Sequence, residues 1–206
     1  SGSFHRALSK KIGLSTGLAW SQHGGSLLFV ESSLCPGKGD IKLTGNLGKV
    51  LQESVAAAFA WIKTNADKFN IDFNILSQND IHVHFPAGAT PKDGPSAGIA
   101  ITTSILSLLT KRPVRNDVAM TGEITLHGKV LPIGGLIEKV LAAHRGGIKE
   151  VLLPIQNQCN IEEIPQDIRN EIKLTPVTNL LEVFDKILIN QEVNNTVLPL
   201  TPCQEI

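Results

Sequence analysis

The chain has 206 residues, of which 42% are hydrophobic and 18% are charged, so a folded domain with a sizeable core is expected and a disordered chain is not. Lys plus Arg and Asp plus Glu each total 19, and this zero net charge argues against a nucleic-acid partner. Three scattered cysteines suit neither a disulfide framework nor a zinc site, and no apolar run reaches the roughly 20 residues of a membrane span, so we expect an intracellular protein with no membrane partner.

The chain begins without a strong pattern, and we expect residues 1–16 to be a linker or a cloning remnant. The apolar runs 18–20 and 26–30 flank Gly24-Gly25 and predict a β-hairpin with the two glycines in its turn. In chain order, the further elements expected are a strand at 41–45, a helix at 47–63, a strand at 80–86, a helix at 96–109, a strand or strand pair at 118–124, a helix at 135–145, a strand at 150–154, a helix at 161–168, a strand at 172–174 and a helix at 180–189.

Two of the expected helices have clear patterns. Residues 47–63 are rich in alanine and carry apolar side chains at three- and four-residue spacing, whereas 96–109 is almost wholly apolar and should be buried on most sides. The stretch 87–94 before the second helix consists of turn-forming residues. Because strands and helices interleave, the predicted fold class is α/β (or α+β), with one domain over 17–190 and a loose tail over 191–206.

Lys139 is the first residue whose surroundings suggest chemistry. Its neighbours at three and four residues along the predicted helix are Gly135, Leu136, Ala142 and Ala143, all small or apolar. A lysine on the buried face of a helix loses its proton more readily, and a lysine with a lowered pKa is a usable general base near neutral pH. The alternative interpretation is a lysine that extends its charged end into water.

Ser96 lies where the turn-rich loop Pro91–Pro95 meets the apolar helix. This position exposes a hydroxyl and places it beside backbone N–H groups at a helix N-terminus, which are suited to hold an oxyanion. An ordinary helix N-cap is the alternative. Gly94–Gly98 also match the G-x-S-x-G pattern of a nucleophile elbow, but a loop separates Ser96 from the preceding strand, and the possible triad partners have no supporting context: Asp117, with His127 or His144.

Several other polar residues have less specific surroundings. Thr121 lies in a predicted strand, where its hydroxyl is able to orient a neutral lysine or its β-branch simply suits the strand. His82 and His84 share one strand face, but no third ligand follows at a telling spacing, so a structural or substrate-proximal pair is favoured over a metal site. The residues around Glu31 and Asp93 do not indicate a role for either side chain.

Sequence blocks along most of the chain add a family resemblance to this picture. They are Gly17–Trp20, Pro36–Gly39, Leu47–Gly48, Pro91–Gly98, Met120–Gly128, Leu131–Gly135, and Lys139 with the following Ala142–Gly147. Together they resemble the proteolytic domain of the ATP-dependent Lon proteases of the bacterial and organellar type. The resemblance extends from about Gly17 to Ile189, and the spacing from Ser96 to Lys139 fits the family.

This resemblance implies a serine endopeptidase with a serine–lysine dyad. Ser96 would form the acyl-enzyme, and Lys139 would be the general base that later returns a proton to the leaving amine. Thr121 would hydrogen-bond the lysine amine, and Asp93 would belong to a loop that blocks or opens the site. Three further residues match positions near the family's active site: Glu31, His82 and His84.

The resemblance also implies a fold and partners. The family fold is an α/β domain similar to domain 2 of ribosomal protein S5, it assembles as a hexameric ring, and its substrates are unfolded, damaged and regulatory proteins. The chain lacks a G-x-x-x-x-G-K-[ST] phosphate loop, so we expect a fragment that holds no cofactor or metal, with ATP and Mg²⁺ bound by an ATPase module outside it. The expected compartment is the cytoplasm, with the mitochondrial matrix or the peroxisome as alternatives.

Two rival functions remain open at this point. A serine hydrolase with a histidine base would use His82, His84 or His144 in place of Lys139. A non-enzymatic interaction domain is the other rival, since similar folds bind RNA, although the neutral net charge argues against it. A class A β-lactamase is excluded because Ile99 occupies the position where its S-x-x-K motif requires lysine.

Overall fold

The computed structural model describes residues 11–190. The tail expected at 191–206 and most of the linker expected at 1–16 lie outside the described residues. The first strand begins at Leu14, so regular structure starts earlier than the Gly17 expected from the sequence.

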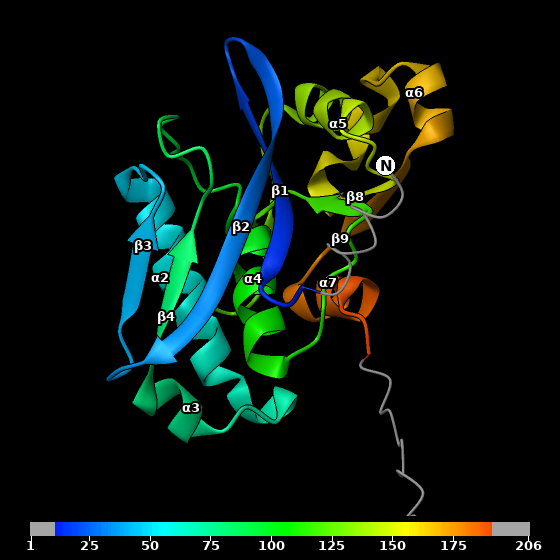
Figure 1. Cartoon of the computed structure of the whole chain (residues 1–206). Helices are drawn as coiled ribbons and strands as arrows, with labels where there is room; N and C mark the ends of the chain where they lie inside the picture. Colours follow the sequence, from blue (N-terminus) through cyan, green and yellow to red (C-terminus); the bar gives the residue numbers. More distant parts are fainter. Residues whose placement is uncertain (1–10, 191–206) are drawn as a thin grey trace, which may run out of the picture.

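A seven-stranded mixed sheet forms the centre of the fold, in the order β3-β4-β2-β1-β5-β8-β9 (Figure 1). Its strands are β1 (Leu14–Ser21), β2 (Gly24–Pro36), β3 (Ile41–Thr44), β4 (Asn79–His84), β5 (Val118–Met120), β8 (Glu150–Pro154) and β9 (Lys173–Val177). Neighbouring strands run parallel except at β2, which is antiparallel to both β1 and β4. A separate small sheet pairs β6 (Glu123–Ile124) with β7 (Val130–Leu131). The α/β class expected from the sequence is confirmed.

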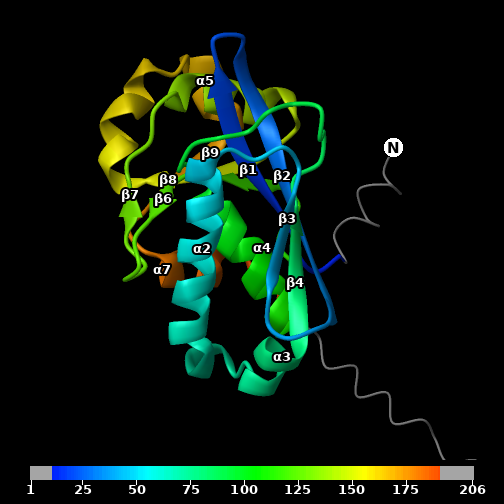
Figure 2. The same ribbon diagram turned by 90° about the vertical axis from the view of Figure 1, so that its left-hand side faces the viewer.

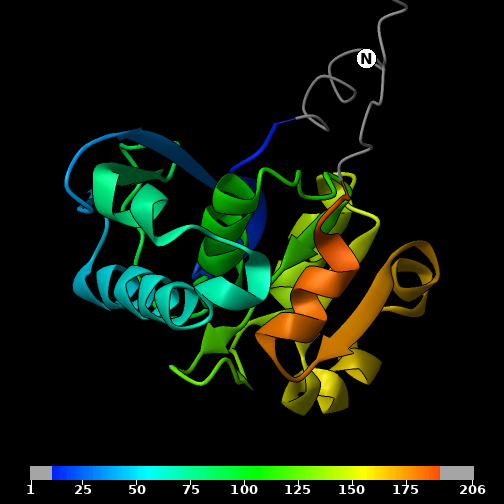
Figure 3. The same cartoon turned by 90° about the horizontal axis from the view of Figure 1, so that it is seen from below.

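Helices cover the two faces of the sheet unequally. They are α2 (Lys49–Thr64), α3 (Phe73–Gln78), α4 (Gly98–Thr110), α5 (Leu136–Arg145), α6 (Gln166–Glu171) and α7 (Leu180–Ile187), with 3₁₀ helices η1 (Ala66–Phe69) and η2 (Ile155–Glu163). The larger core joins α2, α4 and α7 to one face of the sheet (Figure 3). A smaller core packs α5 and η2 against the other face at β1, β5 and β8. The same face remains open over β3, β4 and part of β2.

Helix α4 is the most deeply buried element of the larger core. Ile99, Ile101, Ile105 and Leu106 are fully buried, as the apolar composition of this segment predicts. Its buried Ser104 donates a hydrogen bond to the Gly13 carbonyl at 2.7 Å, whereas the buried hydroxyl of Thr103 has no hydrogen-bond partner among the described residues. The helix that begins just after Ser96 is therefore held rigidly on all sides.

The hairpin is present, but its two glycines do not form the turn as expected. The turn consists of Gln22-His23, and both Gly24 and Gly25 belong to β2. A side chain at Gly25 would place its Cβ 2.1 Å from the Glu138 carbonyl oxygen of α5. The glycine is required by the close approach of a helix to the strand, which short-range sequence patterns do not reveal.

The prediction of a single helix over 161–168 is wrong. The segment instead contains the end of η2, an extended Ile164, and then α6, which starts after Pro165. Proline disfavours the helical conformation of the residue before it, and Ile164 accordingly has φ −80° and ψ 133°. Proline is well suited to begin a helix, however, so the helix starts there.

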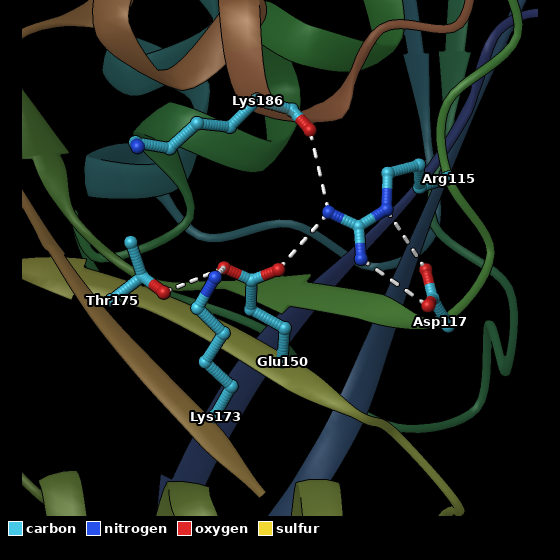
Figure 4. A network of polar contacts seen from close by, with 6 residues as sticks. All are labelled: Arg115, Asp117, Glu150, Lys173, Thr175 and Lys186. Carbon is cyan, nitrogen blue, oxygen red and sulfur yellow. Dashed lines mark hydrogen bonds and ion pairs between the residues drawn. The ribbon is translucent and has the colours of Figure 1, made fainter.

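Charged side chains form a network at the edge of the sheet where β5, β8 and β9 begin (Figure 4). Glu150 accepts hydrogen bonds from Arg115 at 3.0 Å and from the Thr175 hydroxyl, although its side chain is only 8% exposed. Arg115 also binds Asp117 and the Lys186 carbonyl at the end of α7. Burial raises the pKa of Glu150, but the hydrogen bonds outweigh it and hold the pKa below its ordinary value. The network joins the ends of three strands to α7.

Replacing the buried carboxylate should therefore destabilise the fold. We expect Glu150→Gln to lower the free energy of unfolding by about 2 kcal/mol at pH 7, because hydrogen bonds to a charged group are lost. Since the pKa of Glu150 is lowered in the folded chain, this difference is complete above the ordinary pKa of 4.5 and disappears as the pH falls through the folded-state pKa. Urea unfolding at pH 7 and at pH 3 measures it. The exposed Glu53→Gln on α2 is the control and should change stability by less than about 0.5 kcal/mol.

Candidate functional site

Lys139 is fully buried within α5. The helix starts after Gly135, whose φ of 70° is left-handed, and Lys139 lies one turn further on, with 1% of its surface exposed. Burial lowers the pKa of Lys139 to about 8, against an opposing contribution from the neighbouring Glu138. The side chain thus faces the core, as its helical position predicts, and a substantial fraction of the amine is neutral near physiological pH.

Thr121 is the hydrogen-bond partner of the buried amine. The Lys139 Nζ donates to Thr121 Oγ1 at 3.2 Å. Thr121 follows β5 directly and is itself completely buried, and its backbone N–H donates to the Leu152 carbonyl of β8 at 3.0 Å. A residue anchored in the sheet therefore fixes the position of the lysine amine.

Ser96 occupies a half-buried turn immediately before α4. The helix begins at Gly98, later than expected, so Ser96 does not cap it with its side chain. The Gly122 N–H donates to the Ser96 carbonyl at 2.8 Å, and the Ile99 N–H donates to the Gly122 carbonyl at 3.1 Å. These two bonds fasten the Ser96 turn to the residue that follows Thr121.

The backbone N–H groups at the start of α4 were expected to face a reacting oxygen, and two of them have other partners. Gly98 N–H donates to the Pro95 carbonyl, and Ile99 N–H is the donor to Gly122 described above. Among residues 11–190, the N–H groups of Ser96 and Ala97 have no such acceptor. The donors available next to the Ser96 hydroxyl therefore belong to the turn and not to the helix.

Ser96 and Lys139 both line one cavity of about 720 Å³. The β1–β2 hairpin forms one side, and the loop from β4 to α4 runs beside this hairpin to form another (Figure 2). The residues that line the cavity include Trp20, Phe29, Ala87, Thr90, Lys92, Asp93, Ser96, Ile133 and Lys139. Apolar residues dominate the lining, with a few converging polar groups, which is the usual character of a ligand-binding cavity.

Asp93 caps helix α2. Its Oδ1 accepts hydrogen bonds from the Leu51 N–H at 3.1 Å and from the Gly94 N–H at 2.9 Å. A carboxylate at a helix N-terminus satisfies free N–H groups and interacts favourably with the helix dipole. Gly48 makes room for it, because a Cβ there would lie 2.3 Å from the carboxylate. The loop that carries Ser96 is thereby attached to α2.

Glu31, His82 and His84 lie outside the cavity. They occupy the open face of the sheet, where Glu31 is paired with His84 across β2 and β4. Thr44 of β3, which no sequence pattern singled out, hydrogen-bonds to His82 at 2.7 Å and to His84 at 2.6 Å. Phe29 lines the cavity two residues before Glu31 on the same strand face, so this cluster continues the cavity along β2.

The partners considered for a histidine-based mechanism have other contacts. His144 of α5 pairs with Glu171 of α6, and Asp117 is held by Arg115. His127 lies in the exposed turn between β6 and β7. None of these three residues lines the cavity that contains Ser96.

Sequence reasoning did not select three residues that shape the cavity. Trp20 packs on Gly135, where a Cβ would lie 2.4 Å from the indole ring. Buried Asn157 of η2 both donates to and accepts from the backbone of Ile133, each at 2.9 Å. Lys92 binds three backbone carbonyls. Each has at least one partner remote in sequence (Gly135, Ile133 and Gly45, respectively), so local patterns carry little signal for it.

Comparisons with known proteins agree with this geometry. Residues 4–190 match the family described as Lon protease (S16) C-terminal proteolytic domain. The chain is 54% identical to a Lon protease of Escherichia coli K12 over 181 residues and 52% identical to one of Desulfatibacillum aliphaticivorans over 182, in each case 88% of this chain. It is 53% identical to a Lon protease of Xanthomonas oryzae over 192 residues, 93% of this chain.

This family match and these relatives identify an α/β serine peptidase domain. The chain belongs to the Lon protease C-terminal proteolytic domain family. It spans only 22% to 23% of the length of these curated relatives. Within residues 11–190, no helix has the length and apolar character to cross a membrane, and no group of three or more His, Cys, Asp or Glu side chains is arranged to hold a metal ion.

The cap that Asp93 provides can be tested by stability. We expect Asp93→Ala to lower the free energy of unfolding by about 1 kcal/mol, because the N–H of Leu51 loses its acceptor. Asp93→Asn keeps a side-chain oxygen of similar capping strength and should lose clearly less. Urea unfolding of the two variants makes the comparison, and an equal loss in both would contradict the capping role.

Proposed function

We propose that Ser96 is the nucleophile and Lys139 the general base of this peptidase domain. One observation carries the proposal: a fully buried lysine with its pKa lowered to about 8 lines the same cavity as Ser96, a half-buried serine in a turn. A neutral amine is required to accept the hydroxyl proton, and burial supplies it without a histidine. The contacts of His144 and the position of His82 and His84 outside the cavity favour lysine over the histidine alternatives.

In the proposed mechanism, the Lys139 amine removes the Ser96 hydroxyl proton while Ser96 Oγ attacks the carbonyl carbon of the scissile peptide bond. The N–H groups of Ser96 and Ala97 stabilise the resulting oxyanion. The Lys139 ammonium then returns the proton to the leaving amine, and the C–N bond breaks to leave an acyl-enzyme on Ser96. Water, deprotonated in turn by Lys139, hydrolyses that ester and regenerates the free serine.

The remaining expected site residues support this chemistry in different ways. Thr121 accepts from the Lys139 amine at 3.2 Å and thereby orients it toward the cavity. Asp93 acts as a switch: capping α2, as it does here, leaves the cavity open to substrate, and release of the cap would let the loop block it. Glu31, His82 and His84 extend the substrate-binding surface along the open sheet face.

For the longer protein we propose the properties that the family resemblance implies. The domain over 17–190 cleaves unfolded, damaged and regulatory proteins within a homohexamer in the cytoplasm. ATP and Mg²⁺ act in a separate ATPase module. The support is the high identity to bacterial proteins named Lon protease, of which this chain matches less than a quarter.

The dyad is tested first by substitution. We expect Ser96→Ala and Lys139→Met to lower kcat/KM for a fluorogenic peptide by at least about 10³-fold, because each group is needed in the covalent step. Methionine fills the buried volume of the lysine, so the fold should survive, and circular dichroism checks it. His84→Ala is the matched control and should keep substantial activity. Turnover by Lys139→Met together with its loss in His84→Ala would instead make the histidine the base.

The pH dependence tests the same lysine independently. Only the neutral amine is a base, so kcat/KM should rise about tenfold per pH unit below the pKa of Lys139 and level off above about pH 8. A pH–rate profile from pH 6 to 9.5 measures this limb. A limb centred near 6.5, the ordinary pKa of histidine, would contradict lysine as the base.

A further inference from the structure

Lys92 is partly buried, and the dyad does not explain the contacts that its side chain makes. Its Nζ donates to the backbone carbonyls of Gly45 at 2.7 Å, Ala87 at 2.8 Å and Thr90 at 2.8 Å. A lysine ammonium has three N–H donors, so these carbonyls satisfy all of them. Burial lowers the pKa of Lys92, and within residues 11–190 the amine forms no ion pair. Three carbonyl oxygens thus form a cradle for one cation.

The cradle joins two segments remote in sequence. Gly45 follows β3, whereas Ala87 and Thr90 belong to the loop between β4 and α4. The backbone of Lys92 is fixed separately, because its N–H donates to the Asn46 carbonyl at 2.9 Å and its carbonyl accepts from Gly48 at 2.8 Å. The backbone therefore anchors one end of the loop, and the ammonium holds the turn over Ala87–Thr90.

This turn does not have a locally preferred conformation. Ala87 has φ 64°, a left-handed value that costs free energy for a residue with a Cβ. Its carbonyl also accepts the Thr90 N–H at 3.0 Å. Such a conformation persists only where outside contacts impose it, and the Lys92 ammonium is the charged contact that does so.

We propose that Lys92 is a positioning residue for substrate binding: its ammonium holds the Ala87–Thr90 turn in place as one wall of the cavity. The proposal rests on the proposed function, in which this cavity receives the peptide. Ala87, Thr90 and Lys92 all line it. The Ser96 turn is fastened to Gly122 by other bonds, so loss of the ammonium releases the wall without moving the nucleophile.

The first experiment measures the wall directly in the 206-residue chain. In Lys92→Met, amide hydrogen exchange at Thr90 should be at least about tenfold faster than in the wild type, while exchange within α4 is unchanged. The control is Lys49→Met, at an exposed lysine on the first turn of α2, and it should leave Thr90 unaffected. Unchanged exchange at Thr90 in Lys92→Met would overturn the positioning role, whether or not the domain hydrolyses peptide.

The second experiment separates binding from chemistry. For a fluorogenic peptide, Lys92→Met should raise KM roughly tenfold and change kcat less than about twofold, since charge-assisted bonds hold the wall and not the reacting groups. Faster exchange at Thr90 combined with an unchanged KM would overturn the role in substrate binding. A failure of the proposed function would give a different result, because Ser96→Ala would then match the wild type in turnover. In that case the hydrogen exchange at Thr90 still decides whether Lys92 holds the turn.

Chemical rescue distinguishes a cation cradle from general packing. Lys92→Ala should regain a low KM in millimolar propylammonium, which restores both the charge and three N–H donors. Tetramethylammonium carries the charge without an N–H donor and should not restore it. Lys92→Arg should resemble Lys92→Met, because a planar guanidinium has no nitrogen with three N–H donors that could bind the three surrounding carbonyls. Equal rescue by both ammonium ions would overturn the hydrogen-bonded cradle.

Discussion

The burial of the Lys139 amine is the constraint on which the rest of the site depends. A charged lysine among apolar side chains is costly, and the fold responds by lowering its pKa to about 8. The helix that carries it approaches the hairpin so closely that Gly25 has no room for a side chain, and Trp20 closes over Gly135 at the start of the helix. The same packing lowers the pKa of the amine, as the proposed role of Lys139 as a base requires.

Around this amine, the loops of the site are held by hydrogen bonds that cross the chain. The Ser96 turn is fastened to Gly122, Asp93 caps α2, and Lys92 holds the turn before it. The first two bonds join the loop to residues packed against the buried core, and the third fixes the loop internally. A long loop rich in proline and glycine consequently has one defined shape, and the cavity is organised before any substrate arrives.

Most of the helices and strands were predicted correctly because their signals, apolar spacing and turn-forming residues, lie within the element itself or next to it. Apolar spacing located α2 and α5, and turn residues separated the strands on either side of them. The prediction of a helix over 161–168 is wrong because Pro165 disfavours the helical conformation of Ile164. The helical neighbours of Lys139 share one buried face of a single helix, but they left open a lysine that extends its charged end into water.

The sequence by itself determined the fold class and, through its family resemblance, singled out Ser96 and Lys139 as the candidate pair, but the burial of the Lys139 amine is decided by the tertiary structure. Only the tertiary structure decided that Asp93 caps α2, that Glu31, His82 and His84 lie outside the cavity with Thr44, and that Lys92 occupies a cradle of carbonyls. The physical reason is the distance along the chain between the residues that make each contact. A helix face is set by residues a few positions apart, whereas a carbonyl or N–H group far along the chain finds its partner only when the sheet brings the segments together.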